Sequence, residues 1–71
     1  MQSAYNYGKL LGKFRELGLT QADVAARIGI TEGTLNRKLA SEAQFRQGEM
    51  QTIMELIDVP FGSVGEYFFT H

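Results

Sequence analysis

The sequence contains no cysteine, and its single histidine, His71, is the last residue. It therefore provides no disulfide, no cysteine nucleophile and no cysteine-rich or multi-histidine zinc site. It also has no apolar run close to the roughly 20 residues that a membrane-spanning helix needs, and its N-terminus lacks the basic and then apolar order of a secretory signal. We therefore expect a cytoplasmic protein with no membrane partner.

Combinations of residues that carry catalysis are missing too. The 71 residues show no nucleophile–base arrangement and no paired carboxylates, and the eight glycines do not have the spacing of a phosphate-binding loop. A chain of this length forms one small domain with a thin core, which we expect to span residues 1–71. We expect a binding protein that is not an enzyme and that needs no cofactor or metal ion.

The overall charge of −1 hides an uneven distribution. Residues 1–40 carry six basic and three acidic side chains, whereas residues 41–71 carry one basic and five acidic ones. An acidic protein with this asymmetry can present one basic face to a nucleic acid. The competing interpretation is ordinary solvated charge on helix surfaces.

Apolar residues recur at intervals of three and four residues, which is typical of helices, and no segment shows the alternation of a strand. The first helix is predicted over about 7–17, between an N-cap at Asn6 and a terminating glycine at Gly18. A fourth helix is predicted over about 47–57, and Pro60 is expected to stop it.

A capped pair of short helices is predicted between these two. Thr20 caps a helix over about 21–28, Gly29 ends that helix, and Thr31 caps the next one. Because only a tight turn fits between Gly29 and Thr31, the two helices must cross steeply. Leu35 should point inward from the second of them and lie where three helices meet.

The C-terminal part predicts a last helix over about 64–68, with Ser63 and Glu66 spaced as a capping box. Before the fourth helix, the isolated aromatic Phe45 is expected to plug the core beneath an irregular loop. The predicted fold is therefore all-α, with five short helices.

Residues 20–39 closely resemble the helix-turn-helix of the phage repressor and Cro (XRE-type) family. Two motifs carry the resemblance: Leu-Thr-Gln-Ala-x-Val-Ala at 19–25 and Gly-Ile-Thr-x-x-Thr-Leu at 29–35. The small residue Ala25 allows close helix packing, and Gly29 makes the turn that such a unit needs. The resemblance implies a lambda-repressor-like DNA-binding domain with its helix-turn-helix at about 20–39.

Other segments of the chain look like a subgroup of small prophage proteins of Gram-positive bacteria. The matching segments include Tyr-Asn-Tyr at 5–7, Phe-Arg-Gln-Gly-Glu at 45–49 and Glu-Tyr-Phe-Phe at 66–69. Proteins of this subgroup act as Cro-like transcriptional regulators that bind double-stranded operator DNA, or as modulators that bind the main phage repressor protein. An antitoxin, which uses the same fold but usually needs an extra extended segment, is the less favoured third interpretation.

The resemblance implies nine DNA-contacting residues by position. They are Gln21, Thr31, Glu32, Gly33, Thr34, Asn36, Arg37, Lys38 and Arg46. The family uses the first to hydrogen-bond a phosphate, the next four to face base edges or the adjacent backbone, and the last two to contact the DNA backbone. Arg37 is expected to reach a phosphate or a guanine, and Asn36 an adenine or a phosphate. On the alternative interpretation the threonines are only helix caps and the basic residues are solvated surface.

Two positions depart from the family pattern. Gly33 stands where a base-reading side chain is common, and Glu32 can accept a hydrogen bond from cytosine but repels phosphate. Both departures favour the protein-binding modulator as the alternative function.

A helix-turn-helix domain covers one half-site, so a homodimer is expected on two half-sites about 34 Å apart. The candidate dimer or partner surface is the apolar C-terminal set Phe61, Val64, Tyr67, Phe68 and Phe69, of which we expect some but not all to lie in the core. If about four basic side chains neutralise phosphates, the slope of log K against log salt concentration should be about −3.6.

Overall fold

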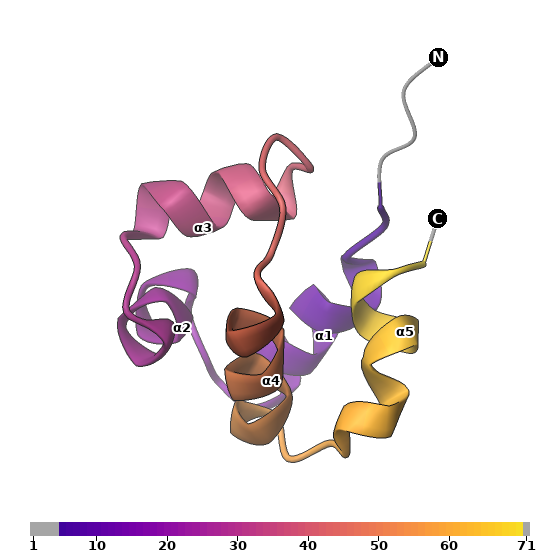
Figure 1. Cartoon of the computed structure of the whole chain (residues 1–71). Coiled ribbons are helices and arrows are strands. Elements are labelled where there is room, and N and C mark those ends of the chain that lie inside the picture. The colour runs from indigo at the N-terminus through magenta and orange to yellow at the C-terminus, as the bar shows by residue number, and fades with distance from the viewer. Residues whose placement is uncertain (1–4, 71) are drawn as a thin grey trace.

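The computed structural model describes residues 5–70, which form five α-helices, one 3-10 turn and no strand. The α-helices are α1 (Gly8–Glu16), α2 (Gln21–Ile28), α3 (Glu32–Leu39), α4 (Gln47–Leu56) and α5 (Val64–Phe68), and the 3-10 turn η1 (Phe61–Ser63) leads into α5. The prediction of an all-α fold with five short helices is confirmed. In Figure 1, α4 lies between the α2–α3 pair and α5, and α1 packs against α5.

Local hydrogen bonds define the boundaries of the α2–α3 pair. The Thr20 hydroxyl accepts the backbone N–H of Asp23 at 3.1 Å, and the Asp23 carboxylate accepts the N–H of Thr20 at 2.9 Å. The bond from the Thr20 backbone N–H, and after it the interaction of the Thr20 hydroxyl with the same carboxylate, hold the pKa of the Asp23 carboxyl below its usual value. Gly29 ends α2 at a φ of 79°, a left-handed conformation that glycine adopts without a steric cost. The predicted cap and turn are therefore confirmed.

The core collects apolar side chains from every α-helix, and it is built around α4. Leu35 lies in it with no exposed surface, as the sequence predicts. Burying a leucine fully stabilises a fold by about 1.5–3 kcal/mol relative to leaving it exposed. The fully enclosed side chains are Leu10, Val24, Leu35, Ile53, Met54, Ile57 and Phe68.

The start of α1 differs from the sequence prediction. Tyr7, not Asn6, is the N-cap of α1, because the Tyr7 carbonyl accepts the first helical hydrogen bond, from the Leu11 N–H at 2.9 Å. The Asn6 side chain still bonds the first turn of the helix by accepting the backbone N–H of Gly8 at 2.8 Å. The end of α4 agrees with the prediction to within one residue: the helix covers Gln47–Leu56, and Asp58 then reverses the chain at a φ of 60°.

The last helix covers Val64–Phe68 with Ser63 at its N-cap, as predicted, but the predicted capping box is wrong, because the Ser63 side chain makes no cap bond. Glu66 forms an ion pair with Lys9 of α1, with 2.7 Å between Oε1 and Nζ. This hydrogen bond is the first cause that holds the pKa of the Glu66 carboxyl below its usual value. The main partner of Glu66 therefore lies across the fold. Within residues 5–70, no helix combines the length and the apolar character that crossing a membrane requires.

Candidate nucleic-acid interface

One side of α3 is exposed along its whole length. Glu32, Gly33, Asn36 and Arg37 are all exposed, and their spacing places them on a single helix face, which we call the outer face of α3. Leu35 faces the opposite way, into the core. The outer face therefore projects from the molecule while the other side of the helix is fixed by packing.

The two threonines at the start of α3 are joined by hydrogen bonds. The Thr31 hydroxyl accepts the backbone N–H of Thr34 at 3.1 Å and lies 2.9 Å from the Thr34 hydroxyl. Thr31 is exposed, whereas Thr34 is half-buried. Capping by Thr31 is therefore confirmed, and it leaves the start of the outer face well ordered.

Gln21 and Arg46 lie at the first turns of the neighbouring helices. Gln21 is the half-buried first residue of α2. Arg46 is exposed at the N-terminus of α4, and it lines a depression of about 470 Å³ together with Gly29 and Ile30. The start of α4 therefore adjoins the turn that leads into α3.

Lys38 does not share the exposure of its neighbours. It is only 6% exposed, and its ammonium lies 2.6 Å from Glu49 Oε1 and donates to the backbone carbonyl of Gln44 at 3.2 Å. The expectation of an exposed lysine beside the DNA backbone is therefore wrong. Its physical reason is the position of Lys38 on α3, three residues after Leu35, which turns it toward α4.

Glu49 is the residue of this region that sequence reasoning missed. Burial alone would raise the pKa of its carboxyl, but hydrogen bonds from the Arg46 backbone and the Lys38 ammonium, with the charges of both residues, hold it below its usual value. Glu49 is therefore a charged partner for Lys38. Lys38 and Glu49 lie on two different helices, so the spacing rules for side chains on one helix do not mark the pair, and only the loop between α3 and α4 brings them together.

The five aromatic and aliphatic residues predicted as a dimer or partner surface separate into three groups. Tyr67 and Phe68 are 8% and 1% exposed and belong to the core, so they are corrected as surface residues. Val64 is half-buried against the core. Phe61 and Phe69 remain exposed, at 40% and 48%.

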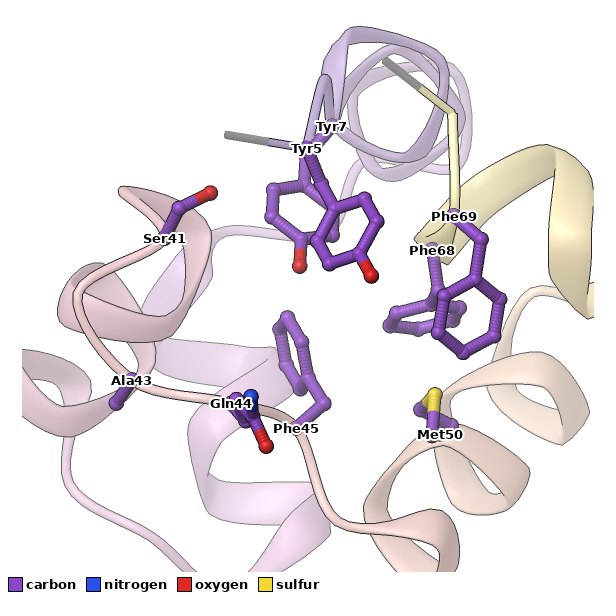
Figure 2. A pocket seen from close by; sticks show the side chains of 9 residues that line it. All are labelled: Tyr5, Tyr7, Ser41, Ala43, Gln44, Phe45, Met50, Phe68 and Phe69. Atoms are coloured by element: carbon purple, nitrogen blue, oxygen red, sulfur yellow. The ribbon is translucent and has the colours of Figure 1, made fainter. Parts of the chain in front are cut away.

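An aromatic cluster lines a cavity between the residues before α1, the end of α5 and the loop before α4. Figure 2 shows Tyr5 and Tyr7 on one side of a cavity and Phe45, Phe68 and Phe69 on the others; its volume is about 280 Å³. The Phe45 ring lies 5.0 Å from that of Phe68 and 5.5 Å from that of Tyr7, both edge-on. The prediction that Phe45 plugs the core beneath the loop is confirmed.

A protein family described as "Protein of unknown function (DUF739)" matches residues 3–71. The chain belongs to this family. Comparison with curated proteins finds no match. The family description names no activity, so the function of this DUF739 member has to be argued from its own residues.

The exposed side chains of this DUF739 member offer several hydrogen-bonding groups. The outer face of α3 offers a carboxylate, a carboxamide and a guanidinium, and Arg46, the N-cap residue of α4, adds a second guanidinium. Among residues 5–70, no group of three histidine, cysteine, aspartate or glutamate residues is arranged to hold a metal ion. The residues can hydrogen-bond base edges, phosphates or the polar groups of another protein.

Proposed function

We propose that this chain is a transcriptional regulator that binds operator DNA through α2 and α3. In this proposal α2 and α3 are a helix-turn-helix, and the outer face of α3 enters the major groove. The supporting observation is that face itself: four exposed positions on a helix whose opposite side is anchored by Leu35. The resemblance to Cro-like prophage repressors agrees with this function.

The proposal includes a homodimer. α3 has eight residues and is about 12 Å long, so it can read one half-site, and two half-sites lie about 34 Å apart. Phe61 and Phe69, the two exposed residues of the apolar C-terminal set, are the candidate contacts of the dimer.

A second candidate function is a modulator that binds a partner repressor protein. It is favoured by Glu32, an exposed carboxylate at the start of the outer face, where it would repel DNA phosphates. The burial of Lys38 also removes one cation from the surface available to DNA. Both observations suit a basic protein partner.

The proposed function is tested by selecting duplexes from a random-sequence pool with the native chain and measuring the affinity for the selected duplex. Arg37→Ala should weaken binding by about 1–3 kcal/mol if Arg37 contacts a guanine. Its thermal midpoint should stay close to the native value, because Arg37 is exposed.

Lys9→Ala is the matched control for that experiment. It removes one exposed positive charge from α1, where Lys9 pairs with Glu66 of α5 rather than lying on the α2–α3 pair. It should keep DNA affinity close to native. Equal losses in the two variants would point to general electrostatic attraction, and a failure to select any duplex would contradict DNA binding altogether.

A further inference from the structure

Lys38 is the one charged residue that is buried among residues 5–70. Removing an ammonium from water is costly unless a carboxylate and further acceptors replace the water. The protein around Lys38 must therefore supply a carboxylate and further acceptors. The segments that supply them are the ones that the Lys38 side chain connects.

Three groups surround the Lys38 ammonium. It donates to Glu49 Oε1 at 2.6 Å and to the carbonyl of Gln44 at 3.2 Å, and it lies 5.9 Å from the centre of the Phe45 ring. The same Glu49 oxygen accepts the backbone N–H of Arg46 at 2.9 Å. A single carboxylate oxygen therefore connects α3, the loop at 40–46 and the first turn of α4.

We propose that Lys38 is a positioning residue for DNA binding, acting through Glu49 on Arg46. The pair holds the first turn of α4 at a set position relative to α3, so that Arg46 meets a phosphate while the outer face of α3 occupies the groove. This inference rests on the proposed function. Lys38 itself touches no DNA, because its ammonium is enclosed by protein atoms.

An ion pair suits positioning better than an apolar contact does. Hydrogen bonds to a carboxylate oxygen have preferred directions and lengths, whereas the attraction between apolar surfaces is non-directional, so the pair restricts the position of the first turn of α4 more narrowly than one apolar contact would. A buried pair replaced by apolar residues of similar volume often leaves stability unchanged or higher. Stability and position can therefore be separated by experiment.

The test uses the double variant Lys38→Met/Glu49→Leu, which leaves the net charge of the chain unchanged. Its thermal midpoint and its affinity for a mixed-sequence duplex, long enough for two half-sites, are measured over a range of salt concentrations. We expect a midpoint near that of the native chain and a clearly weaker affinity. The slope of log K against log salt should be shallower by about 0.9 for each protomer, the contribution of one lost phosphate contact.

Arg46→Ala provides the second readout. Alone, it should reduce the slope by the same amount, about 0.9 per protomer. When Arg46→Ala is added to the double variant, the slope of log K against log salt should change little further, because the effects of coupled sites are not additive. The single variant Lys38→Arg, which keeps the positive charge beside Glu49, should retain part of the slope that the double variant loses.

Each outcome has a defined meaning. A double variant that melts like the native chain and keeps its affinity and slope overturns the positioning role but leaves DNA binding intact. If the double variant does not fold, an unchanged slope in Arg46→Ala overturns the positioning role, since Lys38 is proposed to act through the contact between Arg46 and a phosphate. A native chain that binds no duplex overturns both the positioning role and the proposed function.

Discussion

Arg37 and Lys38 are adjacent in α3 but have opposite surroundings: the side chain of Arg37 is exposed, whereas that of Lys38 is enclosed and ends 2.6 Å from Glu49. With 3.6 residues per turn, consecutive side chains point about 100° apart. Arg37 therefore falls on the outer face and Lys38 falls toward α4. Counting both as surface cations overstates the charge that α3 offers to DNA.

The salt dependence of DNA binding should reflect this difference. Without Lys38, three exposed arginines remain as candidate phosphate contacts: Arg27 in the last turn of α2, Arg37 on α3 and Arg46 at the N-cap of α4. Three phosphate contacts give a slope of log K against log salt of about −2.7 per protomer, against about −3.6 for four. Fluorescence anisotropy titrations across a range of salt concentrations measure it. An affinity that does not change with salt would remove the electrostatic basis of the proposed function.

Glu32→Ala should distinguish the two candidate functions. If the outer face of α3 binds DNA, removing a negative charge beside phosphates should raise the affinity for any duplex. If it binds a basic surface on a repressor, the same variant should weaken that complex by about 1 kcal/mol for a contact at the rim. Both affinities are measured, one for DNA and one for the cognate repressor.

Glu55→Ala is the control for Glu32→Ala, because Glu55 is an exposed glutamate near the other end of α4. It removes the same charge and should leave a specific partner complex unchanged. If Glu32→Ala alters neither affinity, the start of α3 is not a binding surface for either partner.

Leu35→Ala should destabilise the whole domain. Leu35 has no exposed surface, and truncating a buried leucine costs about 2–5 kcal/mol, a large share of the roughly 5–15 kcal/mol that stabilises a typical domain. Leu17→Ala is the matched control, since Leu17 is 45% exposed. Thermal and urea unfolding of both variants measure the difference. Equal effects would show that the packing around α3 is not what anchors the outer face.

Acid should weaken the Lys38–Glu49 pair. The pKa of Glu49 is lower in the folded chain than its ordinary value of 4.5. A carboxyl of this kind contributes stability that is fully present above the ordinary value and is lost as the pH falls through the folded one. The native chain should therefore be more stable than Glu49→Gln at neutral pH, and this advantage should shrink in acid. Melts of both proteins at several pH values measure it, and an advantage that does not vary with pH would contradict the assignment.

The sequence predicts the elements well where the determining contacts are local. Thr20 and Thr31 accept hydrogen bonds from residues three positions later, and Gly29 adopts its turn conformation without any distant partner. These features depend on short-range spacing, which can be read directly from the chain. The same holds for the inward position of Leu35.

The sequence prediction fails where a side chain's partner is distant. Lys38 looks like a surface cation until the loop brings Glu49 to it, and Glu66 looks like a capping residue until Lys9, 57 positions away, takes its carboxylate. Exposure within the aromatic C-terminal set depends on packing between helices, which places Phe68 inside and leaves Phe69 outside. Residue type and spacing alone do not distinguish these two neighbours.

The contact between α1 and α5 has a kinetic consequence. The Lys9–Glu66 pair and the backbone bond from Asn6 to Thr70 join segments almost a whole chain length apart, whereas α2 and α3 are joined by one short turn. Closing a long loop costs more chain entropy than closing a short one, so the ends should meet late during folding. Opening fluctuations should begin at this contact as well, and amide hydrogens of α1 and α5 should exchange with solvent sooner than those of α2.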